Sequence, residues 1–245
     1  MLKPQSMKSK IFWSCLLSTL TLFNTSKILA QTLPLSPQLI PFSSSEGEQL
    51  LVESNAKQDY FLLSNQFVTQ INQAYCGVAS SVMVLNALGL PAPESAQYKP
   101  FRVFTQENFF ERAETKKVIS PELVSRRGMT LAQLGDLLSS HGAKVEVYYG
   151  SDVNLAQFRS LLVQNLSKRD NFAIVNYLRK TIGQERGGHI LPIAAYNQRI
   201  DRFLILDVSR YKYPPVWVKA VDLWQAIATV DTDAGKTRGF VLVTN

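Results

Sequence analysis

One stretch constrains the fold of this chain more than any other: a cysteine at the start of an apolar segment that is predicted to be a helix. Val78 to Leu88 are apolar on nearly every face, Gly89 can end a helix in the left-handed conformation, and Pro91 follows. Cys76 then lies in the first turn, where free N–H groups and the helix dipole stabilise a thiolate. The sequence therefore predicts a buried helix with a reactive thiol at its N-terminal end.

The first thirty residues have the composition of an export signal. Lys8 and Lys10 directly precede the apolar run 11–23, and Ala30 ends a segment suited to cleavage. We expect residues 1–30 to be a signal peptide and the protein to be exported, to the periplasm. An uncleaved membrane anchor is the alternative, although the run is shorter than the roughly 20 residues that a span needs. Cleavage would remove Cys15 and leave Cys76 alone, so neither an intrachain disulfide nor a cysteine metal cluster could form.

Charge and length restrict the possible functions. The formal charge is +7, but four lysines and no acidic residue lie in the signal, which leaves +3 for residues 31–245. A nucleic-acid partner is therefore not expected. The apolar content of 46% suits one domain. We expect it to span residues 49–245, after an extended leader at 31–48 that is rich in Pro and Ser.

Local patterns predict an α+β fold. Two capping boxes, Thr130–Gln133 and Asn154–Gln157, each begin an amphipathic helix, and a shorter helix is predicted around Thr105–Arg112. Further along the chain the pattern changes to strands, with a last helix at about 219–229. The predicted strands are 144–149, 172–178, 189–196, 203–208 and 239–244. A helical half that carries the cysteine would pack on a sheet half, with the site in the cleft between them.

The chain offers a candidate for each role in acyl transfer through a thiolate. The reaction needs a nucleophile, an imidazole that moves its proton, and a group that orients the imidazole. Of the two histidines, His141 closes an amphipathic helix, and we interpret it as structural. His189 opens a strand, and a polar turn at 197–201 predicts a hairpin that brings it near Asp207.

A donor for the oxyanion is also available. Gln70 lies six residues before the thiol, and its amide could act together with the Cys76 N–H. The pattern alone leaves a second interpretation open, in which the cysteine is a buried core residue and His189 a hydrogen-bonded core histidine.

At these residues the sequence resembles the phytochelatin synthases, enzymes of the papain superfamily. The similarity includes Ala74-Tyr75-Cys76-Gly77-Val78-Ala79-Ser80 and Leu204-Ile205-Leu206-Asp207-Val208. It covers roughly residues 49–244, in five blocks that follow the family order: 69–88, 188–193, 204–208, 210–217 and 235–240.

The resemblance implies a papain-like fold and a glutathione gamma-glutamylcysteinyltransferase. Cys76 would attack the cysteinyl-glycine bond, glycine would leave, and a γ-glutamylcysteinyl thioester would remain. Transfer of that acyl group to glutathione makes phytochelatin, and transfer to water makes γ-glutamylcysteine. By motif match His189 is the general base and acid, Asp207 its orienting partner, and Gln70 an oxyanion donor.

The resemblance also suggests residues that bind substrate. Arg179 and Arg238 match family positions, and guanidinium groups suit the carboxylates of glutathione. Lys212 and Tyr213 are candidates for holding an acceptor molecule. The full predicted set is Asn176, Arg179, Gly187, Gly188, Arg238, Lys212 and Tyr213.

We expect no required cofactor and no metal site in the protein. Heavy-metal ions such as cadmium would enter as glutathione thiolate complexes, in keeping with heavy-metal detoxification. A homodimer is left open.

The chain ends where the catalytic half of plant and yeast members ends, and short bacterial members resemble glutathione hydrolases. We therefore expect hydrolysis to exceed transfer. Two alternatives remain: a papain-like cysteine peptidase acting on other peptides, and a non-catalytic periplasmic module that binds thiols or metal.

Overall fold

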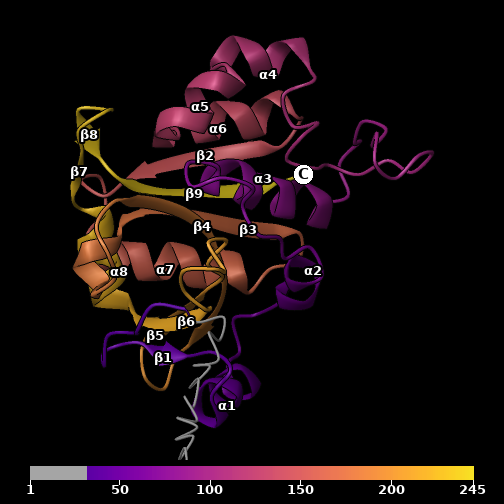
Figure 1. Ribbon diagram of the computed structural model, residues 1–245. Helices are drawn as coiled ribbons and strands as arrows, with labels where there is room; N and C mark the ends of the chain where they lie inside the picture. The colour runs from indigo at the N-terminus through magenta and orange to yellow at the C-terminus, as the bar shows by residue number, and fades with distance from the viewer. Residues whose placement is uncertain (1–31) are drawn as a thin grey trace, which may run out of the picture. The chain divides into compact units, whose positions relative to one another are not determined.

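An antiparallel sheet forms the centre of the fold (Figure 1). The computed structural model describes residues 32–245, so the predicted signal peptide lies outside the described residues. Seven strands pair in the order β1-β6-β5-β4-β3-β9-β2, and every neighbouring pair is antiparallel. Their bounds are β1 Ile40–Pro41, β2 Lys144–Tyr149, β3 Asn171–Leu178, β4 Gly188–Asn197, β5 Arg202–Ile205, β6 Val216–Lys219 and β9 Gly239–Thr244. A separate hairpin pairs β7 (Val230–Asp231) with β8 (Lys236–Thr237).

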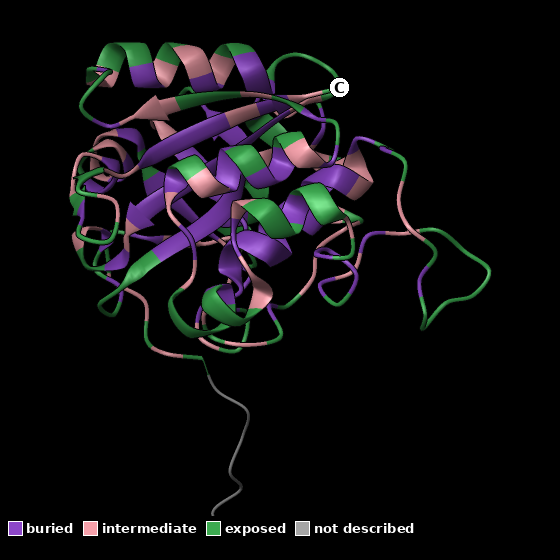
Figure 2. Cartoon of the chain, turned by 90° about the horizontal axis from the view of Figure 1, so that it is seen from above, coloured by how far each residue is buried: buried purple, intermediate pink, exposed green. Residues whose placement is uncertain are grey.

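Helices cover both faces of the sheet, which confirms the predicted α+β class. The helices α3 (Cys76–Ala87) and α6 (Leu131–Ser140) lie on one face, and α7 (Leu155–Leu166) and α8 (Ala220–Ile227) on the other. Each face of the sheet has its own hydrophobic core. Side chains alternate along each strand, so Ile174 packs in the core under α3 and α6, and its neighbour Val175 packs in the core under α7 and α8. Figure 2 shows the central strands as buried and the outward faces of the helices as exposed.

The local signals for helices are largely confirmed. Both capping boxes form, with Thr130 and Gln133 bonded reciprocally, and Asn154 and Gln157 likewise. Gly89 has φ +66° just past α3, the conformation that a glycine accepts without steric cost. The five predicted strands and the last helix are all present within a few residues of their predicted bounds.

The predicted leader at 31–48 is wrong in its second half. Strand β1 pairs with β6, and helix α1 (Ser45–Glu53) begins at Ser44, whose hydroxyl accepts a hydrogen bond from Gly47 N at 3.0 Å. The indole of Trp217 donates to the Gly47 carbonyl at 2.9 Å. Regular structure therefore begins before residue 49, because β6, far along the chain, provides the partner that the local sequence lacks.

The helix predicted around Thr105–Arg112 is also wrong. Thr105 and Asn108 do bond reciprocally, but the backbone continues as turns, with Phe109 and Phe110 both buried. The helices come later, as α4 (Ala113–Val118) and α5 (Pro121–Arg127), after which the chain enters α6. A short helix α2 (Tyr60–Ser64) and a 3₁₀ turn (Arg179–Ile182) complete the elements.

Within residues 32–245, none of the helices has both the length and the apolar character needed to span a bilayer.

Candidate active site

Helix α3 places Cys76 where the sequence predicted, in the first turn and against the sheet. The hydroxyl of Ser80 donates to the carbonyl of Ile190 at 3.1 Å, which fixes α3 on strand β4. The thiol is a free cysteine, and the residue is 8% exposed. It nevertheless lines the main cavity of the described chain, so a ligand can reach it.

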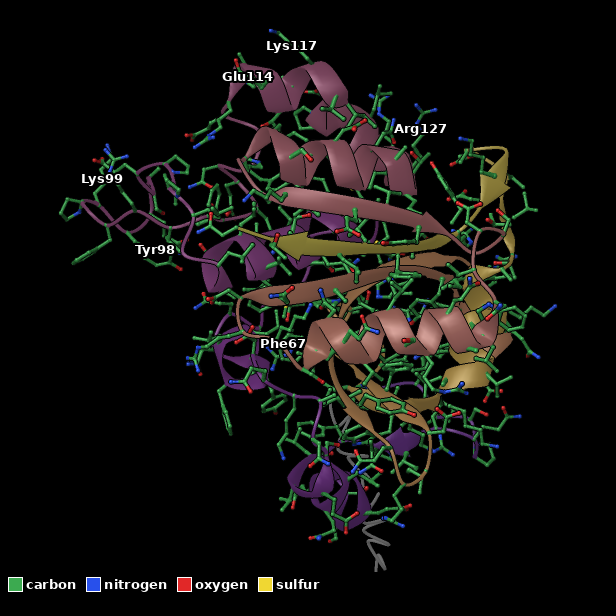
Figure 3. The ribbon with its side chains drawn as sticks, turned by 180° about the vertical axis from the view of Figure 1, so that it is seen from behind. Phe67, Tyr98, Lys99, Glu114, Lys117 and Arg127 are labelled. Carbon is green, nitrogen blue, oxygen red and sulfur yellow. The ribbon has the colours of Figure 1, made fainter. Side chains whose placement is uncertain are left out.

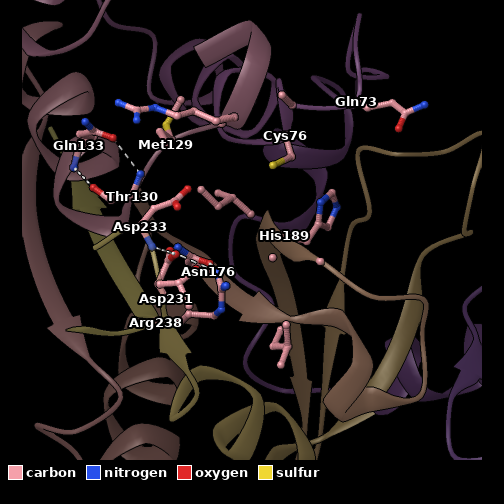
Figure 4. A pocket seen from close by; sticks show the side chains of 18 of the residues that line it. Gln73, Cys76, Met129, Thr130, Gln133, Asn176, His189, Asp231, Asp233 and Arg238 are labelled. Carbon is pink, nitrogen blue, oxygen red and sulfur yellow. Dashed lines mark hydrogen bonds and ion pairs between the residues drawn. The ribbon is translucent and has the colours of Figure 1, made fainter. Parts of the chain in front are cut away.

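The hairpin of β4 and β5 brings His189 and Asp207 together, which confirms their predicted proximity. The Nε2 atom of His189 lies 2.7 Å from Asp207 Oδ1. The carboxylate is fully buried, and it also accepts a hydrogen bond from Ser209 N at 2.8 Å. Because Nε2 is engaged with the carboxylate, Nδ1 is the ring nitrogen left for the thiol. Figure 4 shows the imidazole beside the Cys76 sulfur.

The electrostatics favour an ion pair between sulfur and imidazole. Burial would raise the pKa of the Cys76 thiol, but the hydrogen bond and charge of His189 outweigh it and hold that pKa below its ordinary value. Burial would likewise lower the pKa of His189, and the charge of Asp207 outweighs it and raises that pKa. The pKa of Asp207 is held far below its ordinary value, against the effect of burial, by His189 and Arg179. These directions favour a thiolate and an imidazolium, as thiol catalysis needs.

Behind the imidazole, Arg179 holds the same carboxylate. Its two terminal nitrogens lie 2.8 and 3.1 Å from the oxygens of Asp207, and the guanidinium is 4% exposed. It also donates to Gln184 Oε1 at 2.7 Å, and the hydroxyl of Tyr177 donates to the same oxygen at 2.9 Å. Arg179 therefore lies behind the catalytic candidates, and it does not line the cavity as a predicted substrate-binding residue would.

Gln70 lies close to the site, with its amide engaged by the protein. Its Nε2 donates to the Asn72 carbonyl at 2.7 Å and to the Tyr211 hydroxyl at 3.3 Å, and its Oε1 accepts from Ser209 at 2.6 Å. Gln70 does not line the cavity. Its role as an oxyanion donor stays a prediction, and that role requires the amide to exchange one of these partners for the substrate.

The main cavity has a volume of about 730 Å³, in the upper part of the usual range for small-ligand sites. Of the predicted substrate-binding residues, Asn176, Gly187, Gly188 and Arg238 line it, together with Cys76 and His189. Lys212 and Tyr213 do not. Lys212 pairs with Glu185 at 2.7 Å, and the buried Tyr213 accepts a hydrogen bond from Glu185 N at 2.8 Å.

Opposite the thiol, Arg238 and Asp231 form a polar end of the cavity. Arg238 Nη1 lies 3.0 Å from Asn176 Oδ1 and 3.3 Å from Asp231 Oδ2, whereas its buried Nε has no partner among the described residues. Gly188 leaves room for this arrangement, because a Cβ at this position would clash with Arg238 Nη1, which would have to move. Asp233 also lines this end (Figure 4).

Several lining residues escaped the sequence analysis. The polar ones among them include Asn72, Gln73, Ser125, Arg126, Arg127, Asp231, Thr232 and Asp233. The acidic turn 231–233 and the basic end of α5 at 126–127 are both of a kind that is common on protein surfaces. Neither therefore indicated a binding site from the sequence alone. What makes them notable is their convergence on Cys76, which the tertiary fold produces.

His141 lies away from the cavity, packed between Phe104 and Phe109 with ring centroids at 5.1 and 4.7 Å. Among residues 32–245, no group of three or more His, Cys, Asp or Glu side chains is placed to hold a metal ion.

Comparisons with known proteins point to one family. The family model described as phytochelatin synthase matches residues 30–240. Glutathione gamma-glutamylcysteinyltransferase 1 of Lotus japonicus is 36% identical over 211 residues, which cover 85% of this chain and 41% of that protein. The Arabidopsis thaliana protein of the same name is 37% identical over 221 residues, 89% of this chain and 44% of its own length.

A yeast relative extends the comparison. The glutathione gamma-glutamylcysteinyltransferase of Schizosaccharomyces pombe is 26% identical over 213 residues, 85% of this chain and 50% of that protein. The chain thus spans about two fifths to one half of the length of these relatives. Since the family model covers most of the chain, including Cys76, His189 and Asp207, the chain belongs to the phytochelatin synthase family.

Proposed function

We propose that this protein cleaves glycine from glutathione through a γ-glutamylcysteinyl thioester on Cys76. The observation that carries the proposal is the Cys76–His189–Asp207 arrangement at the wall of a cavity with a charged end. The names of the relatives support glutathione as the substrate.

The proposed first step is acylation. The Cys76 thiolate attacks the carbonyl carbon of the cysteinyl-glycine bond, and the oxyanion forms near the N–H groups of the first turn of α3. The imidazolium of His189 gives its proton to the leaving glycine nitrogen, and the C–N bond breaks. Asp207 keeps the ring oriented throughout, since it holds Nε2 at 2.7 Å and leaves Nδ1 toward the sulfur.

The charged end of the cavity suits the γ-glutamyl group. That group ends in an ammonium and a carboxylate. The carboxylates of Asp231 and Asp233 suit the ammonium, and the guanidinium of Arg238, which lines the cavity, suits the carboxylate. Asn176 holds Arg238 in place, and Gly188 leaves room for it.

In the second step His189 accepts a proton from the group that attacks the thioester. Attack by water releases γ-glutamylcysteine, and attack by the amine of another glutathione releases phytochelatin. Water is always available at the cavity, whereas an acceptor has to bind first. We therefore propose that hydrolysis is the main reaction and transfer the weaker one. Heavy-metal ions such as cadmium would take part as glutathione thiolate complexes, as substrate.

Product analysis tests the proposal directly. The full chain is incubated with glutathione, with and without cadmium, and free glycine, γ-glutamylcysteine and longer oligomers are separated and quantified. We expect free glycine together with γ-glutamylcysteine, and loss of both in Cys76→Ser, which keeps the volume of the side chain but lacks the thiolate. The contrary result is equal glycine release by Cys76→Ser, as a non-catalytic binding module predicts.

Two further controls address the remaining possibilities. Rapid cleavage of peptides that lack a γ-glutamyl end would instead favour a general cysteine peptidase. Export to the periplasm remains a separate proposal, which N-terminal sequencing of the mature protein tests.

A further inference from the structure

Two groups of charged residues line the cavity, and the thiol of Cys76 lines it with them. One wall carries the paired Arg238 and Asp231, assigned above to the γ-glutamyl end of the acyl donor. The other wall is the C-terminal end of α5, where Ser125, Arg126 and Arg127 line the cavity. Figure 3 shows Arg127 at this end of the helix, on the same side of the molecule as the β7–β8 hairpin.

The end of α5 is fixed close to the nucleophile. Gly128, with φ +78°, closes the helix against the loop before Cys76, so that a Cβ here would lie 3.5 Å from the Ala74 carbonyl. The side chain of Met129 packs on Gly77, the residue after the thiol. The two arginines therefore belong to a segment that contacts the nucleophile's own loop and helix from both sides of Cys76.

The charge of this wall is not neutralised by a contact ion pair. Among the described residues, neither Arg126 nor Arg127 has a carboxylate within 4.0 Å, although Glu122 lies one turn back on the same helix, where the charge of Arg126 helps to lower its pKa. Both side chains are exposed to solvent at the cavity. The α5 wall is thus suited to an anion, whereas the Arg238 wall is suited to a zwitterion.

We infer that Arg126 and Arg127 form the subsite for the acceptor glutathione, and that they bind its carboxylates. The inference rests on the proposed function. The acceptor's amine must attack the thioester carbon from the side that the glycine nitrogen has left, which is opposite the bound γ-glutamyl group. In that step the amine nitrogen bonds to the carbonyl carbon, the C–S bond breaks, the sulfur of Cys76 takes the electron pair, and His189 accepts the amine proton.

The chemistry of the acceptor matches this wall. Glutathione carries two carboxylates and one ammonium, and a metal-thiolate complex of it carries further negative charge. The earlier candidates for this role, Lys212 and Tyr213, face Glu185 outside the cavity. Arg126 and Arg127 are cations that line the cavity itself.

The test compares two double variants of the full chain. Arg126→Gln/Arg127→Gln removes two charges from the wall. Lys116→Gln/Lys117→Gln removes the same number from the exposed part of α4, which does not line the cavity. The readout is the partition ratio, phytochelatin formed per glycine released, measured at several concentrations of glutathione with and without cadmium.

We expect the arginine variant to lower the partition ratio by about tenfold, and the lysine variant to leave it unchanged. Arg126→Lys/Arg127→Lys should restore part of the ratio. Added salt should lower the ratio of the parent more than that of the arginine variant, because salt screens exposed charges.

Three results would overturn the inference. The first is an unchanged partition ratio in the arginine variant. The second is a parallel loss of glycine release and transfer, which would assign the arginines to the donor's glycine carboxylate. The third is a parent that releases glycine but transfers nothing to glutathione, which leaves the proposed hydrolysis intact. A parent that releases no glycine would instead refute the proposed function, so the two failures are distinguishable.

Discussion

Replacing Arg179 by Met should move the pH profile of glycine release to higher pH. The guanidinium and the imidazole share the Asp207 carboxylate, at 2.8 and 2.7 Å. A positive charge there disfavours protons on its neighbours, and the charge of Arg179 lowers the pKa of both Cys76 and His189. Its removal should therefore raise both pKa values, the thiol on the acid limb and the imidazolium on the alkaline limb.

The size of the shift follows from the geometry. Two hydrogen bonds through one carboxylate place the guanidinium about 6 Å from the imidazole, and at an effective dielectric constant of about 20 the repulsion is roughly 3 kcal/mol, or about two pH units. Relaxation around the smaller side chain reduces this, so we expect both limbs to move up by about one to two units.

The assay is kcat/KM for glycine release between pH 5 and 10, with Lys180→Met as the matched control. Lys180 is exposed beside Arg179, so its removal should leave the limbs nearly in place. Arg179→Met also breaks a buried ion pair, at a cost of about 3–5 kcal/mol, so circular dichroism must first show a folded variant. Arg179→Lys keeps the charge and should keep the limbs near those of the parent even where kcat falls. Unmoved limbs in a folded Arg179→Met, or a shift to lower pH, would refute the reasoning.

Two further predictions follow from the packing. Gly188→Ala places a methyl group against the Arg238 guanidinium, which can move aside, so KM for glutathione should rise by about tenfold while the fold is kept; an unchanged KM would show that Arg238 does not bind substrate. Burial, helped by the charge of Arg112, lowers the pKa of His141 from 6.5 to about 4. Between these two pH values His141 is protonated in the unfolded chain but not in the folded chain. The free energy of unfolding should therefore fall by roughly 3 kcal/mol as the pH drops from about 6.5 to about 4. Urea unfolding at pH 7 and 4.5 should show this loss in the parent and a much smaller one in His141→Leu; equal losses would exclude His141 as the cause.

The parts of the fold that local sequence specifies were predictable. The helix of Cys76, both capping boxes and the β4–β5 hairpin depend on residues within about twenty positions of each other, so pattern alone located them. The hairpin also brought His189 to Asp207. Strand β1 was missed because its partner strand, which contains Trp217, lies more than 170 residues away along the chain, whereas helix α1 was missed although Ser44 caps it locally.

The site was predictable only in part, for the same reason. Arg179 was expected at the substrate because a guanidinium suits a carboxylate, and the carboxylate it holds is that of Asp207. Nothing in the sequence near position 179 distinguishes these two partners. Asp231 and the end of α5 line the same cavity although about a hundred residues of chain separate them, which no local pattern encodes.

The shared carboxylate explains how one histidine can serve both steps of the proposed reaction. Before acylation the buried charges can balance, since Arg179 pairs with Asp207 and the shifts of the Cys76 and His189 pKa values favour a thiolate paired with an imidazolium. Once the sulfur carries an acyl group, His189 has given its proton to the glycine and no thiolate is left to favour its return, while Arg179 still neutralises Asp207, so the pKa of His189 is lower than in the free enzyme. The imidazole is then neutral, which is the form that accepts a proton from water or from an acceptor amine. Without Arg179, Asp207 would hold the imidazolium in the acyl-enzyme as well, and deacylation would slow more than acylation.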